Sequence, residues 1–201
     1  MKSKSLVRYI NLINILIFFC WNYENGSESE FMFNNFLVSW VGLLEGRIWT
    51  LITSVFSHNI LLHLLMNTLV LMSFGPVVEA RLGRRRFLYF YLAAGAFSSL
   101  CHAAVSAFLL HDPSIPALGA SGAISGVILF FSLLYPKEKI FLLGFIPLPA
   151  LLGAFAFVGL DIWGLVEQSG GGGLPIGHGA HLGGALAGAI YFILLRKKQL
   201  V

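Results

Sequence analysis

The sequence predicts an all-α, polytopic membrane protein with six transmembrane helices, built as a single domain over residues 1–201. Three observations support this prediction. The chain is 57% hydrophobic and only 11% charged, its mean hydropathy is +0.83, and its apolar residues fall into six runs. A soluble domain is about 25% charged, so this chain has too few charges to cover a globular surface. Each span needs about 20 residues, which leaves little chain for a second domain.

The six apolar runs predict spans over approximately residues 7–21, 60–78, 87–110, 120–135, 148–166 and 181–195. The first run is short and contains Arg8, Asn11 and Asn14, and Lys2 and Lys4 before an apolar stretch also resemble a secretory signal. No small-residue cleavage site follows Cys20, which favours a span. The 22 glycines follow no Gly-X-Y period and indicate helices packed closely through small faces.

The positions of the basic residues predict the orientation of the chain. In a six-span arrangement Arg47 lies on one side of the membrane, and the other twelve Lys and Arg lie on the opposite side: Lys2, Lys4, Arg8, Arg81, Arg84, Arg85, Arg86, Lys137, Lys139, Arg196, Lys197 and Lys198. The positive-inside rule then places both termini in the cytoplasm. Glu24, Glu28, Glu30, Glu45 and Asp112 then lie on the outer side, as that orientation expects. We expect a multi-pass protein of the cell (inner) membrane of a bacterium.

The remaining composition limits the partners and the redox chemistry. The basic residues lie in short loops and are not interleaved with aromatic ones, so the lipid bilayer is the expected partner and nucleic acid is not. Cys20 and Cys101 lie inside apolar runs, which indicates buried free thiols rather than a disulfide. Residues 22–57 are too long for a tight connection, and we expect them at the outer interface, partly helical.

Polar side chains inside spans are costly and usually face a bundle interior or a water-filled cavity. Such residues lie toward the outer ends of three spans: His63 and Asn67 in the second, Ser121 in the fourth and His181 in the sixth. Counted from the basic residues at the far end of each helix, three of them, Asn67, Ser121 and His181, lie roughly 21–22 Å up. A carboxamide, a hydroxyl and an imidazole therefore share a level about 8–9 Å below the outer boundary.

Small residues predict that the fourth and sixth spans approach closely, because backbones meet where side chains are small. These residues are Gly122 and Gly126 on the fourth span and Ala180, Gly184 and Gly188 on the sixth. Both small faces begin beside the serine or the histidine, so the two side chains can meet across the seam.

The pairing of Ser121 with His181 suggests acyl transfer. A serine hydroxyl becomes an effective nucleophile when an adjacent base takes its proton, and His181 would be that base. The oxyanion of the transition state needs donors, which backbone N–H groups at a helix start, with His63 and Asn67, would supply. No carboxylate has a comparable claim at this level, so a Ser-His dyad is expected rather than a triad. For Asp161, inside the fifth span, we expect a helix-packing or lateral-gate role, or an outer helix end near water, rather than a proton relay.

In these residues the chain resembles the rhomboid family of intramembrane serine proteases. The resemblance runs from Trp49 to Gly188 and rests on three motifs in order: HxxxxHxxxN from His58, GxSG from Gly119 and AHxxG from Ala180. It implies a six-transmembrane-helix rhomboid bundle that hydrolyses transmembrane or juxtamembrane segments of single-span membrane proteins, without a metal or another cofactor.

The resemblance also assigns roles to residues. It implies that Ser121 is the nucleophile and His181 the general base, and that the oxyanion hole consists of the His63 and Asn67 side chains with the Ser121 backbone. His58, Gly119 and Gly122 would support this site.

Three features depart from the family pattern. Thr50 follows Trp49 where many members have Arg, so the anchoring of the outer segment is open. Ser125 stands where some members have an aromatic residue against the catalytic histidine, so the support of the His181 ring is open. The glycine-rich outer loop before His181 is longer than in compact bacterial members.

Other functions are alternatives to the protease. A catalytically inactive rhomboid-like protein that binds and routes membrane proteins typically lacks the serine or the histidine, and this chain has both. A transporter would show inverted repeats or paired broken helices, which are not visible. His178 and His181, with His63, suggest a metal site, but the sequence has no HExxH motif and no acidic ligand expected at that depth.

Overall fold

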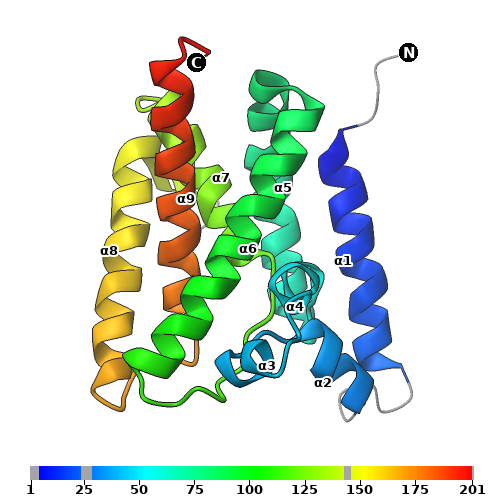
Figure 1. The fold of residues 1–201 in the computed structure, drawn as a ribbon. Coiled ribbons are helices and arrows are strands. Elements are labelled where there is room, and N and C mark those ends of the chain that lie inside the picture. Colours follow the sequence, from blue (N-terminus) through cyan, green and yellow to red (C-terminus); the bar gives the residue numbers. More distant parts are fainter. Residues whose placement is uncertain (1–4, 24–28, 143–145, 201) are drawn as a thin grey trace.

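The computed structural model describes residues 5–23, 29–142 and 146–200. Six long helices form a bundle in this part of the chain (Figure 1), which confirms the predicted helical membrane fold. They are α1 (Leu6–Asn22), α5 (Leu61–Leu82), α6 (Arg84–Phe108), α7 (Ser121–Leu134), α8 (Ala150–Ser169) and α9 (His178–Lys197). Each begins and ends within four residues of the predicted span.

The helices differ in length, and the shortest is the central one. By length and composition, α5, α6, α8 and α9 are long and apolar enough to cross a membrane, whereas α1 and α7 are shorter. The 14 residues of α7 extend roughly 21 Å, less than a bilayer core of about 30 Å. α7 contacts α5, α6, α8 and α9, and Ala120 just before it is fully buried, so its N-terminus lies inside the bundle.

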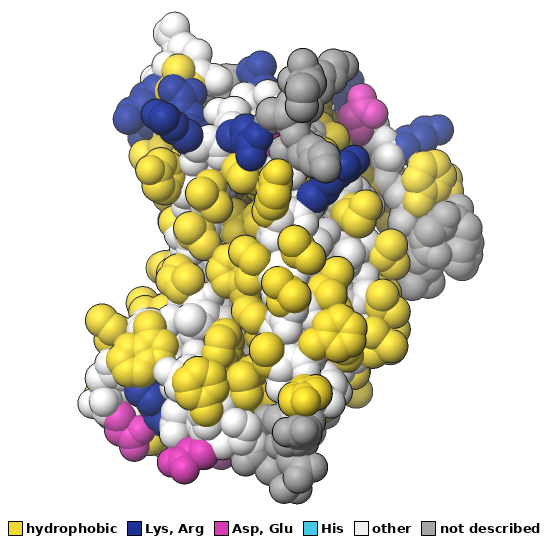
Figure 2. Space-filling model, turned by 90° about the vertical axis from the view of Figure 1, so that its right-hand side faces the viewer, with side chains coloured by type: hydrophobic (Ala, Val, Ile, Leu, Met, Phe, Trp, Pro, Cys, Tyr) yellow, Lys and Arg dark blue, Asp and Glu magenta, His cyan; other side chains and the backbone are white. Residues whose placement is uncertain are grey.

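The outer surface is apolar around the middle of the bundle. Figure 2 shows a wide band of hydrophobic side chains, with most of the visible Lys and Arg gathered at one end of the molecule. Leu62 on α5 and Trp163 on α8 are 68% and 63% exposed, as expected for side chains that contact lipid. The predicted positions of Lys2, Lys4, Glu24 and Glu28 lie outside the described residues.

Short helices connect α1 to α5, as predicted for residues 22–57. They are α2 (Glu30–Phe36), α3 (Trp40–Leu44), α4 (Thr50–Thr53) and the 3₁₀ helix η2 (Ser54–Phe56). Serine caps begin two of them: Ser29 accepts the N–H of Met32, and Ser39 accepts that of Gly42. These helices lie at the end of the bundle opposite the C-terminus of the chain (Figure 1).

An antiparallel hairpin before α8 was not predicted. β1 (Lys139–Leu142) pairs with β2 (Ile146–Pro149), with Lys139 opposite Pro149. The apolar run predicts a span from Leu148, whereas the helix begins at Ala150. Proline fixes φ and has no backbone N–H, so Pro149 suits the position just before the first helical turn.

Candidate active site

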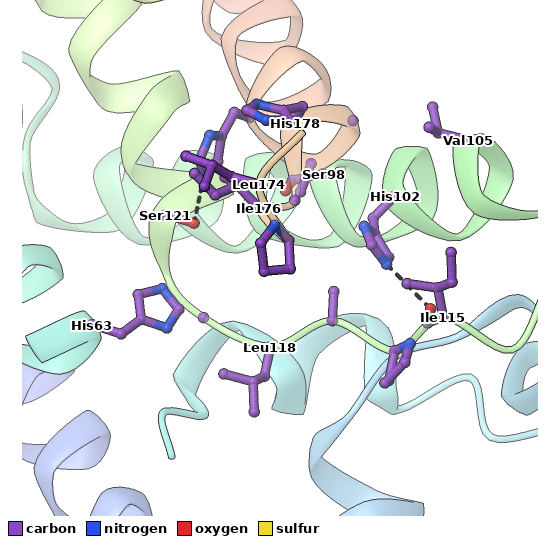
Figure 3. A pocket seen from close by; sticks show the side chains of 18 of the residues that line it. His63, Ser98, His102, Val105, Ile115, Leu118, Ser121, Leu174, Ile176 and His178 are labelled. Carbon is purple, nitrogen blue, oxygen red and sulfur yellow. Dashed lines mark hydrogen bonds between the residues drawn. The ribbon is translucent and has the colours of Figure 1, made fainter. Parts of the chain in front are cut away.

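The loop before α7 places Ser121 at the helix start. Gly119 has φ +122°, a conformation that L side chains rarely adopt, and a Cβ there would lie 2.5 Å from Cε1 of His63. Gly119 therefore lets the chain turn into α7 while its backbone touches the His63 ring. Ser121 and His63 lie at one end of the cavity in Figure 3, with His102 and Ile115 at the other.

The glycine seam between α7 and α9 confirms the predicted close approach. A Cβ on Gly184 would lie 1.8 Å from the carbonyl oxygen of Gly122, and one on Gly188 would lie 2.4 Å from that of Gly126. Helix backbones are therefore in direct contact along this seam, and no side chain larger than hydrogen fits at either position without displacing a helix.

This contact brings the predicted serine and histidine together. Nε2 of His181 lies 2.9 Å from Oγ of Ser121, marked by the dashed line at Ser121 in Figure 3. The distance is that of a hydrogen bond, and the His181 side chain is only 12% exposed. A hydroxyl and a potential proton acceptor thus meet within the bundle.

A carboxylate also reaches this imidazole, so the expectation that none lies at this level is wrong. Oδ1 of Asp161 lies 3.0 Å from Nδ1 of His181 and 2.7 Å from Nδ1 of His178. The side chain of Asp161 is 6% exposed. Helix counting missed this contact because it fixed the depth of three helices only, and it cannot give the rotation of α8 about its axis.

The aromatic support of His181 comes from α8 and not from α7. The ring of Phe157 lies 5.5 Å from that of His181, with 32° between the planes. Phe157 precedes Asp161 by four residues, so both side chains lie on one face of α8. Ser125 stands where some family members have an aromatic residue, and its hydroxyl donates to the carbonyl of Ser121 at 2.8 Å. An aromatic and a carboxylate at this helical spacing were the signal that could have identified the face.

The two histidines of the HxxxxHxxxN motif pack against each other beneath the start of α7. Their ring centroids lie 5.0 Å apart with 64° between the planes. The N–H of Ala120 donates to Nε2 of His58 at 3.4 Å, which fits the supporting role expected for His58. Burial, together with the neighbouring His63 ring, lowers the pKa of His58 to about 4. His58 is therefore neutral near pH 7.

Asn67 lies on the predicted face but uses part of its amide on its own helix. Its Nδ2 donates to the carbonyl of His63 at 2.8 Å. An amide nitrogen carries two hydrogens, so one of them remains available for another acceptor. Asn67 and His63 both line the cavity that contains Ser121.

A cavity of about 1130 Å³ surrounds the serine. Side chains of α5, α6, α7 and α9 line it, together with the loops before α7 and α9. On its far side, Nε2 of His102 lies 3.2 Å from the carbonyl oxygen of Ile115, which ties α6 to the loop before α7. The glycine-rich loop closes another wall, and Gln168 donates to the carbonyls of Leu174 and Ile176 at 2.6 and 2.8 Å.

The segment between α1 and α5 is held by hydrogen bonds and an ion pair near Thr50, which stands where many family members have Arg. The Thr50 hydroxyl donates to the carbonyl of Arg47 at 2.6 Å, and the Arg47 guanidinium pairs with Glu45 at 2.5 Å. An arginine three residues upstream of Thr50 therefore supplies a cationic anchor in this segment.

Asp161, His178 and His181 are the one cluster of potential metal ligands that the described ranges contain, with ligand atoms within 4.8 Å of one another. An acidic group therefore lies beside the two histidines, contrary to the expectation that none does. Two imidazoles and a carboxylate are ligands that Zn²⁺ accepts. The separations of 2.7 and 3.0 Å, however, are those of N–H···O hydrogen bonds to a shared oxygen.

Comparison with known proteins agrees with the motifs. The family model of the Rhomboid domain matches residues 45–198. The chain belongs to the rhomboid family. It is 33% identical over 98% of its length to the RHOMBOID-like protein 12, mitochondrial, of Arabidopsis thaliana, and 31% identical over 98% to the Presenilin-associated rhomboid-like protein A, mitochondrial, of Danio rerio. It spans 60% and 51% of those two relatives. Over 57% of the chain it is 36% identical to the Rhomboid protease GluP of Bacillus subtilis, of which it covers 21%.

The predicted location in a bacterial inner cell membrane is wrong. Rhomboid relatives that match most of the chain include mitochondrial proteins from a plant, a yeast and a fish and a chloroplastic protein from the same plant, and they point to an organellar membrane of a eukaryote. The assignment of both termini to the cytoplasm is overturned with it. The positive-inside rule ranks the two sides of a membrane by their Lys and Arg content, and this pattern does not identify the compartment.

Proposed function

We propose that this rhomboid protein is an intramembrane serine endopeptidase that cleaves transmembrane or juxtamembrane segments of single-span membrane proteins. The observation that supports this most strongly is the distance of 2.9 Å between Nε2 of His181 and Oγ of Ser121. The pair lies within the helix bundle at the edge of a cavity of about 1130 Å³, large enough for several residues of an extended peptide.

In the first step Oγ of Ser121 attacks the carbonyl carbon of the scissile bond while Nε2 of His181 takes the hydroxyl proton. The resulting tetrahedral intermediate carries a negative oxygen. When it collapses, the C–N bond breaks and His181 gives the proton to the leaving amine, which leaves an acyl-enzyme on Ser121. Water then attacks the ester with the same base, releases the new carboxyl end and restores Ser121.

The negative oxygen requires donors that are already in place. The backbone N–H of Ser121 belongs to the first turn of α7, where amides have no partner within the helix. His63, which carries an imidazole ring, and Asn67, which carries an amide, line the same cavity. We assign these three groups to the oxyanion hole.

The geometry also constrains the substrate. A carbonyl inside a transmembrane helix is hydrogen-bonded within that helix and shielded, so the substrate must unwind locally before Ser121 can attack it. We therefore expect cleavage where small or helix-breaking residues lie near a membrane surface. No metal or nucleotide is required for the steps described.

The test combines serine-directed labelling with substrate cleavage. Purified protein in detergent is treated with a fluorescent fluorophosphonate, and a single-span reporter is incubated with the same samples. We expect labelling and cleavage by the wild type and loss of both in Ser121→Ala and His181→Ala.

Matched controls separate chemistry from folding. Ser132→Ala removes another buried hydroxyl of α7, and His111→Asn replaces an exposed histidine that has φ +57°, a conformation that Asn tolerates. Both controls should keep labelling and cleavage. Cleavage by Ser121→Ala at the wild-type rate, or no cleavage and no labelling by the wild type, would contradict the proposed function.

A further inference from the structure

The carboxylate of Asp161 contacts two imidazoles through a single oxygen. Oδ1 lies 3.0 Å from Nδ1 of His181 and 2.7 Å from Nδ1 of His178. Nδ1 of His181 is the ring nitrogen opposite the one that faces Ser121. A serine hydroxyl, an imidazole and a carboxylate are therefore joined in a row across α7, α9 and α8.

We propose that Asp161 is a positioning residue that holds His181 ready to accept the Ser121 proton. This inference rests on the proposed function. A carboxylate accepts hydrogen bonds and donates none, so its contact requires a hydrogen on Nδ1 of His181. The lone pair of that ring is then on Nε2, which faces Ser121. Without Asp161 the ring can adopt the other tautomer, in which Nε2 carries a hydrogen and cannot act as the base.

The charge of Asp161 contributes a second effect. When the Ser121 proton moves to Nε2, His181 becomes an imidazolium, and a negative charge at hydrogen-bond distance stabilises it strongly where water is scarce. Among the residues that the structure describes, the other titratable groups that face His181 are His178 on its own helix, His63 on α5 and His102 on α6. None of those three histidines supplies a negative charge, so the stabilisation comes from Asp161.

His178 has a different part in this arrangement. It packs on the backbone of α8, since a Cβ on Gly164 would lie 2.3 Å from its Nε2. Gly164 lies one turn from Asp161 on α8. His178 thus packs α9 against α8 and shares Oδ1 of Asp161 with His181, while the hydrogen bond of Ser121 goes to His181.

The experiment measures the fluorophosphonate labelling rate as a function of pH, together with kcat and KM for the reporter. In Asp161→Asn we expect kcat and the labelling rate to fall by about 10²–10⁴, with KM unchanged within threefold. The acidic limb of the rate profile should move to lower pH, because the imidazolium loses its anionic neighbour. Asp161→Glu, which keeps the charge, should restore part of the rate.

A matched control is Glu79→Gln. Glu79 is a buried carboxylate far from the site that accepts the N–H of Leu6 at 2.9 Å and so fixes the start of α1. Its variant should lose stability and keep the wild-type rate profile. His178→Ala should lower the rate by less than tenfold and leave the acidic limb in place, because Asp161 still contacts His181. His178→Ala tests the proposal even where Asp161→Asn does not fold.

The outcomes separate the two proposals. A fall of more than tenfold in Asp161→Asn together with a displaced acidic limb supports the positioning role. A smaller fall, an unchanged limb, or an equally displaced limb in His178→Ala overturns it, while labelling that depends on Ser121 leaves the protease proposal intact. A wild type that neither labels nor cleaves refutes the protease itself.

Discussion

Replacing Gly184 by alanine tests whether the glycine seam sets the distance between nucleophile and base. The added Cβ would lie 1.8 Å from the carbonyl oxygen of Gly122, whereas ordinary contacts begin at 3.4 Å. The helices must therefore separate locally by up to about 1.6 Å, the difference between those two distances. The hydrogen bond between Oγ of Ser121 and Nε2 of His181 is 2.9 Å long and weakens beyond ~3.2 Å. A displacement of this size would therefore break it.

The same substitution has opposing effects on stability. Alanine favours a helix over glycine by about 1 kcal/mol, while overpacking a close contact typically costs 1–3 kcal/mol. We expect a net loss, visible as a melting temperature lower by a few degrees in detergent. The labelling rate of Ser121 should fall by tenfold or more. Gly159→Ala on α8 is the matched control, because nothing beyond its own stretch of helix backbone lies within 4 Å of its Cβ position, and it should keep the labelling rate without lowering the melting temperature. Wild-type labelling by Gly184→Ala would refute the view that backbone contact positions the pair.

Three further predictions concern the loop and α5. Gly119→Ala should abolish labelling, because its Cβ would lie 2.5 Å from the His63 ring at a φ of +122°; a rate within threefold of wild type would show that the loop adapts. Asn67→Ala should lower kcat for the reporter by ~10²–10³ with little change in KM, as for removal of one oxyanion donor, and an unchanged kcat would remove Asn67 from the oxyanion hole. Folding lowers the pKa of His58 from 6.5 to about 4. Between these two values the unfolded chain binds a proton at His58 that the folded chain does not bind. The free energy of unfolding should therefore drop by about 3 kcal/mol as the pH falls to 4. In His58→Gln the acid-induced decrease in melting temperature should be smaller by that contribution, and identical pH curves for the two proteins would contradict this.

Hydropathy, spacing and motif order were sufficient to predict the scaffold. Apolar runs fix helix positions because a membrane span needs a minimum length of apolar residues. Rise per residue fixes the depth of a side chain along its helix, and this count places Ser121 and His181 at one level. Glycines at every fourth residue fixed which faces meet, since only small residues allow backbone contact.

The tertiary structure alone decided how α8 joins the site. Depth along a helix can be counted in the sequence, but rotation about the axis depends on packing with neighbours that are distant in the chain. That rotation turns Asp161 and Phe157 toward His181 and supplies the carboxylate and the aromatic support that residue order did not reveal. It also decided that Asn67 donates one hydrogen to its own helix, because a side-chain rotamer responds to the space around it and not to its position in a motif.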